Sequence, residues 1–145
     1  MRTGKMKLIA SAVTIIALFS VSFSHAFTAG DYYLPVSAEA KAITGDIQID
    51  DFSIRFETGA TMKFSELVAE TYEVDGKELP ASVYRVAQPA DPALKDGKYL
   101  CGKGDVSYIV YWMAVPEQIT IGVFTGDKPP RNDAERCRAY IYKNR

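Results

Sequence analysis

The sequence predicts a mainly β protein: a small antiparallel barrel or sandwich of about seven strands, with one disulfide and possibly one short helix. Three observations support this. Apolar and polar residues alternate with a period of two in several segments. Turn residues separate these segments at intervals of about ten residues, as in small barrels and sandwiches. The chain has two cysteines, Cys101 and Cys137.

Residues 1–26 are predicted to be a secretory signal peptide. Three basic residues precede an uncharged apolar run of about 16 residues, 8–23. The Ser-His-Ala sequence at 24–26 places small residues where a signal peptidase reads, so cleavage before Phe27 is expected. A retained anchor is less favoured, because a spanning helix needs roughly 20 apolar residues. We therefore expect one β-rich domain, residues 27–145, in the periplasm or secreted, without stable membrane insertion.

The first expected elements form a hairpin. Residues 27–41 show no lasting period, which predicts an ordered lead-in with a helical turn near 37–41. Alternation then predicts strands over 43–49 and 52–56. Asp50-Asp51 joins these strands as a tight turn.

The middle of the chain is less regular. A short strand is predicted over 61–64. Segment 65–74 combines a helix-like start with β-branched and aromatic residues, so helix and strand both stay open. Asp75-Gly76 indicates a turn, 83–86 a short strand and 89–97 a loop.

The last third contains the most apolar segment. The run over 106–115 is typical of a central strand covered on both faces. Pro116-Glu117 ends it, and 118–125 supplies the partner strand. A polar loop over 126–133 leads to a final strand over 136–143.

Two cysteines in an exported chain predict a Cys101–Cys137 bridge, because the periplasm is oxidising. The bridge would close a loop of roughly 35 residues and stabilise the domain by about 3–4 kcal/mol. An intermolecular bond or a reactive thiol is less favoured, since the chain has no Cys-x-x-Cys motif.

The charge of residues 27–145 argues against nucleic acid as a partner. This part has 14 basic and 18 acidic residues, because the preceding segment holds three of the 17 basic residues and no acid. Phosphate binding depends on clustered Lys and Arg, and no basic run is present. Binding to an anionic membrane is equally disfavoured.

Histidine is missing from the expected mature domain, because His25, the single histidine of the chain, lies in the signal segment. Nucleophilic sites of the Ser-His-Asp and Cys-His kinds therefore lack their base. Common zinc and copper sites lack ligands. We predict no catalytic residue, no cofactor and no metal site.

A carboxylate pair of the glycosidase kind is the remaining enzymatic hypothesis. Its candidates lie in and beside the first hairpin: Asp46, Asp50, Asp51 and Glu57. Their alternation with apolar residues favours a solvated face or a turn instead. The oxygen-bearing residues of loop 126–133 match no calcium loop, which favours an ordinary polar loop.

The candidate interaction surface combines a strand with a loop. Consecutive strand residues point to opposite faces, so at least one of Tyr111 and Trp112 faces away from the core. An exposed aromatic could anchor an interface, although packing against the core or a second sheet is favoured. Loop 126–133 contributes Asp127 and Arg131.

Part of the chain resembles small exported proteins of Proteobacteria, over roughly residues 43–142. The resemblance rests on Leu100-Cys101-Gly102-Lys103-Gly104, Tyr108-x-Val110, Ile121-Gly122-Val123-Phe124-Thr125-Gly126, Pro129-Pro130 and Cys137-x-x-Tyr140. It implies export, a disulfide and β architecture, and no activity.

The chain is also similar to periplasmic inhibitors of C-type lysozyme, which are small, exported, disulfide-bonded β-barrels. A mildly acidic surface would complement a cationic lysozyme. The Ser-Gly loop of that family is missing, and Lys103-Gly104 alone does not replace it.

The sequence thus predicts an exported, periplasmic, non-enzymatic binding module with an unknown protein or small-molecule partner in the envelope. An inhibitor of a lysozyme or another hydrolase is the alternative, and a carboxylate-based enzyme is the third hypothesis.

Overall fold

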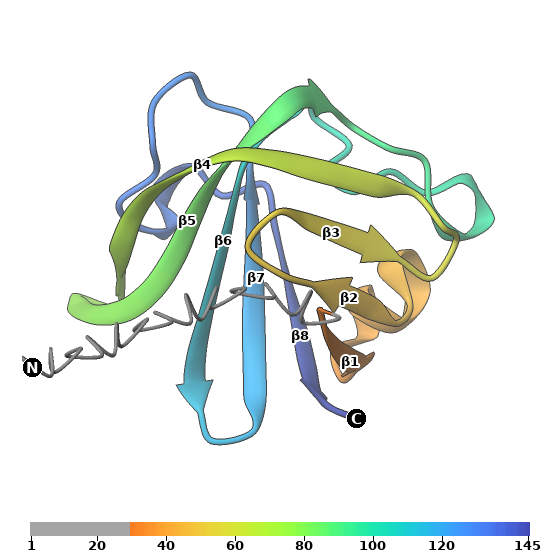
Figure 1. Cartoon of the computed structure of the whole chain (residues 1–145), viewed down its shortest axis with the longest axis horizontal. Helices are drawn as coiled ribbons and strands as arrows, with labels where there is room; N and C mark the ends of the chain where they lie inside the picture. Colours follow the sequence, from red (N-terminus) through yellow and green to blue (C-terminus); the bar gives the residue numbers. More distant parts are fainter. Residues whose placement is uncertain (1–29) are drawn as a thin grey trace, which may run out of the picture.

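Eight antiparallel strands form a closed barrel in the computed structural model, which describes residues 30–145 (Figure 1). Each strand pairs with the next along the chain, and the last pairs with the first. The strands are β1 (Asp31–Pro35), β2 (Ile47–Ile49), β3 (Ser53–Phe56), β4 (Thr61–Val74), β5 (Lys77–Ala90), β6 (Val106–Val115), β7 (Gln118–Phe124) and β8 (Arg138–Asn144). Three short helical turns are η1 (Ala40–Thr44), η2 (Lys95–Gly97) and η3 (Asp133–Glu135). The mainly β prediction is confirmed.

The predicted count of seven strands is wrong, because β1 lies in the segment expected to be only a lead-in. Its five residues end in Pro35 and are too few to establish a period. Strands alternate in direction along a meander, so the first and last strands are antiparallel only when their number is even. Pairing of Tyr33 with Asn144, and of its neighbours with Lys143 and Tyr142, therefore closes the barrel with an eighth strand.

The expected helical turn is present over 38–41 and continues through η1 to Thr44, and β2 begins only at Ile47. The predicted strand over 43–49 therefore starts too early. Ile43 is buried, in phase with the strand that follows, although it belongs to the turn. The Thr44 hydroxyl and the Tyr142 hydroxyl are 2.6 Å apart and share a buried hydrogen bond. This contact ties the turn to β8.

The undecided segment 65–74 is strand, as part of the 14-residue β4. Its partner β5 also has 14 residues. The predicted strands over 61–64 and 83–86 are therefore parts of one long hairpin, at the end away from its turn. Asp75 and Gly76 form the connecting turn with φ angles of 51° and 78°. Such positive angles suit Asp-Gly in a two-residue turn.

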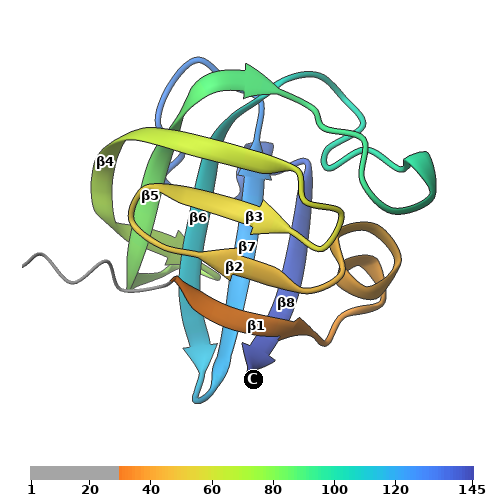
Figure 2. The ribbon, with the colours of Figure 1, turned by 45° about the vertical axis from the view of Figure 1, so that its right-hand side comes forward.

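Strands β6, β7 and β8 agree closely with the sequence prediction. β6 has the predicted bounds, and β7 and β8 differ from theirs by one or two residues at an end. Figure 2 shows these three strands side by side in the barrel wall. The closed arrangement is a barrel and not a sandwich.

Side chains fill the interior of the barrel. Isoleucine, valine, methionine, phenylalanine and tyrosine from successive strands alternate inward, as expected for a small barrel. Buried members of this core include Tyr33, Ile47, Ile54, Phe56, Met62, Val86, Ile109, Ile121, Val123, Tyr140 and Tyr142. No buried polar side-chain atom of the described residues lacks a hydrogen-bond partner.

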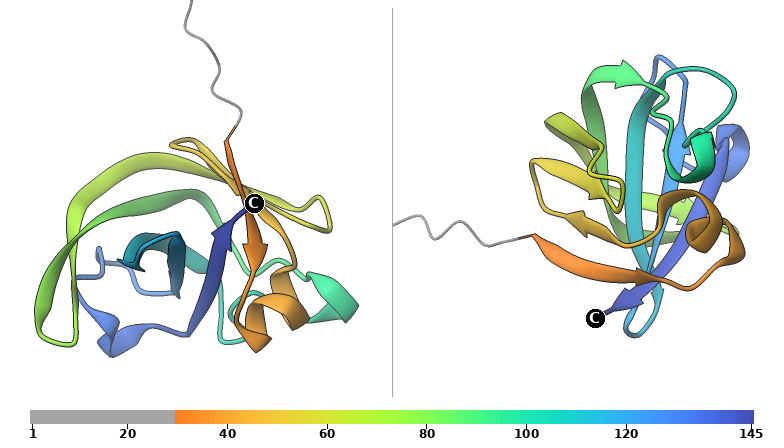
Figure 3. Two further views of the ribbon diagram at one scale, coloured as in Figure 1. Left: turned by 90° about the horizontal axis from the view of Figure 1, so that it is seen from below. Right: turned by 90° about the vertical axis from the view of Figure 1, so that its right-hand side faces the viewer.

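A second apolar cluster lies on the outer face of β6 and β7. The long β4–β5 hairpin curves around the barrel wall (Figure 3), and its Tyr72 packs there on Trp112 and Phe124, with ring centroids 5.1 and 6.1 Å apart. Gly122 lies beneath this stack, where a Cβ atom would come within 3.3 Å of the Trp112 ring. β6 is therefore covered on both faces over 106–112, whereas 113–115 are exposed, so the prediction for 106–115 holds only in part.

The disulfide lies at the end of the barrel where β8 begins. Cys101 and Cys137 form it with their Cα atoms 5.7 Å apart, which confirms the predicted bridge. Leu94 and Leu100, in the segment between β5 and β6, are buried in the core and cover this end. The Asp91 carboxylate also accepts hydrogen bonds from two consecutive backbone N–H groups, those of Cys101 and the next residue, each at 2.7 Å.

Tyr72→Ala is expected to lower the free energy of unfolding by about 3–5 kcal/mol, because it removes a buried aromatic ring from the outer cluster. Trp112 is the one tryptophan of the chain, so the protein's tryptophan fluorescence reports on the packing of Tyr72 over it. In Tyr72→Ala the emission should shift to longer wavelength, because Trp112 becomes exposed to water. Thr71→Ala, at an exposed neighbouring position, is the control and should leave both unchanged. An unshifted emission in Tyr72→Ala would contradict the docked hairpin.

Cys101→Ser is expected to lower the free energy of unfolding by about 3–4 kcal/mol, because the bridge restricts the unfolded chain. Cys137→Ser should have the same effect, since it removes the same bond. Chemical denaturation of the variants, and of the wild type with and without reductant, measures this. Equal melting temperatures with and without reductant would refute it.

Candidate functional site

The four residues of the predicted interaction surface do not form one surface. Trp112 faces outward but is 3% exposed, because Tyr72 covers it. Trp112 is therefore packed against other side chains, which was the favoured expectation, and is not an exposed interface anchor. Tyr111 points into the barrel and is half-buried.

Asp127 and Arg131 lie in the loop between β7 and η3, and both are exposed. Backbone contacts hold this loop against the barrel. The Tyr108 hydroxyl donates to the Asp127 carbonyl at 3.3 Å. The Glu73 N–H donates to the Arg131 carbonyl at 2.9 Å. The loop is thus anchored near the outer cluster while its charged side chains face solvent.

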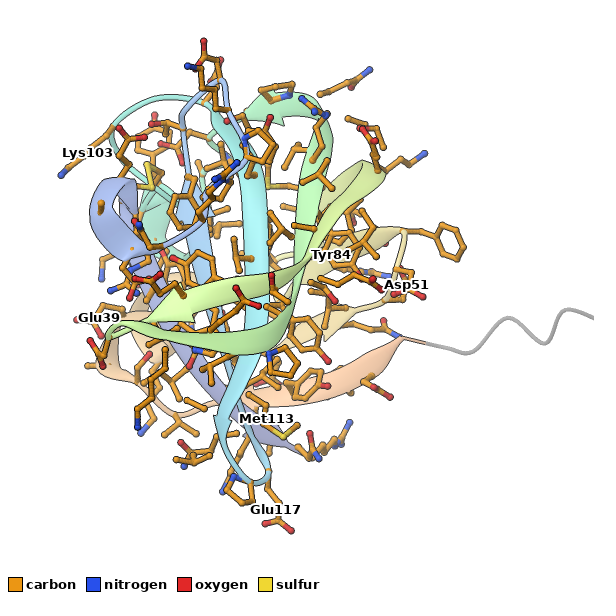
Figure 4. The ribbon with its side chains drawn as sticks, turned by 90° about the vertical axis from the view of Figure 1, so that its left-hand side faces the viewer. Glu39, Asp51, Tyr84, Lys103, Met113 and Glu117 are labelled. Carbon is orange, nitrogen blue, oxygen red and sulfur yellow. A yellow bond between two sulfur atoms is a disulfide. The ribbon has the colours of Figure 1, made fainter. Side chains whose placement is uncertain are left out.

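Three tyrosines gather inside the barrel at the end formed by β1, the β2–β3 turn and the middle of β5. Tyr84 stacks on Phe64 with ring centroids 4.4 Å apart. Its hydroxyl donates to the Asp51 carboxylate at 2.7 Å, and Figure 4 shows these two side chains next to each other. Tyr111 lies near both Tyr84 and Tyr33 and contributes to raising their pKa values.

Burial keeps Tyr84 and Tyr33 protonated. It is the main cause that raises the pKa of Tyr84 to about 12, and the hydrogen bond to Asp51 adds to it. Burial likewise raises the pKa of Tyr33 far above its usual range, with Tyr111 and Asp31 as smaller contributors. The hydroxyls are therefore neutral hydrogen-bonding groups near pH 7, and not proton acceptors for catalysis.

Three aspartates line the same end of the barrel. Asp31 pairs with Ile49 across the β1–β2 ladder. A Cβ atom at Gly30 would come within 3.2 Å of Asp50, so the first residues of β1 run beside the β2–β3 turn. We call Asp31, Asp50 and Asp51 the aspartate rim. Two basic residues also lie close, Lys63 opposite Ser53 and Arg145 over the Tyr32 ring, so the three aspartates leave a small net negative charge there.

Three large apolar side chains are exposed on the turn and the two strands next to the buried Tyr84. Phe52, in the β2–β3 turn, is 71% exposed, and Leu67, opposite Tyr84 on β4, is 45% exposed. Met113, two residues beyond Tyr111 on β6, is 52% exposed, and it lies on the same side of the molecule as Tyr84 in Figure 4. We call Phe52, Leu67, Met113 and Tyr84, together with the aspartate rim, the Tyr84 face.

The Tyr84 face was not predicted from the sequence. Phe52 was placed in the second strand as one more alternating apolar residue, and Leu67 lay in the undecided segment. One available signal was the position of Phe52 directly after Asp50-Asp51. The Asp50 carboxylate accepts the Phe52 N–H at 2.7 Å, which puts Phe52 in the turn rather than in the strand.

The carboxylates of the enzymatic hypothesis have separate structural partners. Asp46 accepts a hydrogen bond from the Tyr32 hydroxyl at 3.0 Å. Glu57 lies 3.5 Å from the Lys95 ammonium group, and Asp51 accepts the Tyr84 hydroxyl. Among residues 30–145 no group of three or more potential ligands from His, Cys, Asp and Glu is placed to hold a metal ion.

Comparison with protein-family models, curated proteins and solved structures found no match to this chain. Within the described part, no helix has the length and apolar character needed to span a membrane. The functional argument therefore rests on the Tyr84 face itself. Its chemistry is that of a contact surface: exposed apolar groups, neutral hydroxyls and carboxylates.

Alkaline pH is expected to destabilise the barrel, in part through Tyr84. Its pKa is about 12 in the folded state against an ordinary value of 10.0, so the unfolded chain loses this proton first. Between these values the free energy of unfolding falls as pH rises, by up to about 1.4 kcal/mol per pH unit from this group.

Tyr84→Phe should make that decline shallower than in the wild type, while the other buried tyrosines keep their contributions. Urea unfolding at intervals between pH 9 and 12 measures the two slopes. Identical slopes would show that Tyr84 ionises equally in the folded and unfolded states.

Proposed function

We propose that this chain is an exported, non-enzymatic binding module that docks a basic protein partner on the Tyr84 face. The observation that carries the proposal is the exposure of Phe52, Leu67 and Met113, each about half or more, with three aspartates in or next to the turn that carries Phe52. Burying such side chains against a partner recovers about 25 cal/mol per Å² of apolar area.

The composition of the face supports an interface with a central contact and a charged edge. Aromatic and other large apolar side chains supply most of the energy in protein interfaces. Charges at the edge accelerate the encounter with a partner of opposite sign and weaken with salt. The excess of acidic over basic residues in 27–145 acts in the same direction.

The alternative function is inhibition of a strongly basic hydrolase such as a C-type lysozyme. The aspartate rim is the observation that favours it, because a cationic enzyme would be attracted to this end of the barrel. Inhibition differs from simple binding by blocking turnover of the enzyme. A lysozyme activity assay with purified protein at micromolar concentration separates the two.

Phe52→Ser with Leu67→Ser is expected to abolish partner capture, because it removes most of the exposed apolar surface of the face. The protein, produced from the full-length chain and immobilised, is incubated with envelope extract, and bound material is identified by mass spectrometry. A basic protein should be retained by the wild type, released as salt is raised, and lost with the double variant.

Tyr99→Ser is the matched control, because Tyr99 is 54% exposed but lies beside the disulfide, away from this face. It should capture the partner like the wild type. Salt-insensitive capture, or equal capture by the double variant and the wild type, would contradict the proposal.

A further inference from the structure

A depression of about 620 Å³ opens on the molecular surface between η1 and the disulfide-bonded loop. Figure 3 shows η1 and η2 next to each other at this place. Figure 4 shows Glu39, on its rim, on the opposite side of the molecule from Asp51. The lining residues are Ala38, Glu39, Ala42, Ile43, Lys98, Tyr99, Gly102 and Arg138. The depression is therefore distinct from the Tyr84 face.

Arg138 provides the cationic group of this depression. One terminal nitrogen of its guanidinium donates to the Tyr99 carbonyl at 3.1 Å. The other lies 3.3 Å from the place where a Cβ atom of Gly102 would be, so the glycine leaves room for the guanidinium. The contact with Tyr99 fixes the group and uses one of its five N–H donors.

No carboxylate of residues 30–145 lies within 4 Å of the Arg138 guanidinium. Asp91, the acid of the same loop, has both oxygens bonded to the backbone N–H groups of Cys101 and Gly102. Arg138 is half-buried, and a half-buried cation gains from an anionic partner more than an exposed one does. Burial raises the pKa of the Tyr140 hydroxyl, and the Arg138 guanidinium next to it acts to lower that pKa. The guanidinium also lines the depression.

The other walls complement the body of a ligand. Ala38, Ala42 and Ile43 form an apolar side with little bulk, and the exposed Tyr99 ring stands across from them. Lys98 adds a second positive charge and Glu39 one negative charge, so the lining is net positive by one. An anionic end group on Arg138 would thus have an apolar neighbour next to it.

We propose that this depression binds the C-terminal carboxylate of a peptide, with the carboxylate on Arg138 and the last side chain between Ala42 and Tyr99. A carboxylate matches the planar guanidinium through two parallel hydrogen bonds. The depression is open on its outer side, so a chain that continues into solvent fits it better than an enclosed small molecule. This site is independent of the Tyr84 face and its partner.

The test is a titration of the protein, produced from the full-length chain and labelled with nitrogen-15, with an acetylated Ala-Ala-Ala-Leu peptide. The free-acid peptide should shift the amide signals of Ala42, Tyr99 and Gly102. The same peptide with a C-terminal amide should bind at least tenfold more weakly, because it cannot pair with the guanidinium. Equal binding of acid and amide, or shifts located elsewhere, would overturn the proposal.

Two variants test the site from different sides. Arg138→Gln removes the charge and should weaken binding at least tenfold. Ala38→Trp fills the depression from an exposed position while keeping Arg138, and it should also abolish binding. If Arg138→Gln fails to fold, the binding measurement on Ala38→Trp alone tests the proposed site. Wild-type affinity in Ala38→Trp would refute the site.

Arg55→Gln is the matched control, because Arg55 is an exposed arginine on β3, outside the depression. It should bind the free-acid peptide like the wild type. Acetate provides the last comparison. If acetate alone binds with the affinity of the peptide, the site recognises only a carboxylate ion and the peptide proposal fails.

Discussion

Closure of the sheet by pairing of β1 with β8 is the constraint on which the rest of the structure depends. Without it, both strands would be edges with unpaired backbone groups, which invite pairing with other chains. β1 is short, but two further contacts hold the chain after it against β8. The Ser37 hydroxyl accepts a hydrogen bond from the Ile141 N–H at 3.1 Å, and the hydroxyls of Thr44 and Tyr142 share a buried hydrogen bond. The interior of an eight-stranded barrel is narrow enough for side chains to fill, and here the core residues of successive strands pack there.

The β4–β5 hairpin is longer than the barrel wall requires, and this excess length creates the outer cluster. Its distal half brings Tyr72 over the outward-facing Trp112, and the Tyr72 hydroxyl donates to Asp133 at 2.5 Å. The same hairpin bonds to the loop before η3 through the backbone of Glu73. One element thus shields an aromatic strand face from water and adds a second anchor to a loop that Tyr108 already holds.

Long segments with a clear period were predictable from the sequence, and short ones were not. β6 and β7 have enough alternating or apolar residues, with Pro116-Glu117 between them, to define both bounds. β1 has five residues, and η1 contains Ile43 in phase with β2, so local patterns gave no strand for the first and a false start for the second. Because consecutive strand residues point to opposite faces, the sequence placed Tyr111 and Trp112 on opposite faces of β6. Only the fold shows that Tyr72 covers Trp112. The Tyr84 face combines β1, β4, β5, β6 and a turn, which no local pattern reveals.

Contacts within the barrel hold both candidate surfaces in place. At one end, Tyr84 fixes Asp51, and the Asp50 carboxylate fixes the turn that carries Phe52. At the other end, the disulfide, Asp91 and Arg138 hold the loop that carries Tyr99. Binding to such preformed surfaces costs less ordering entropy than binding to mobile loops. A rigid, filled barrel with an acidic face and a separate cationic depression is therefore well suited to recognition, because its strands and turns have already restricted the groups that make contact.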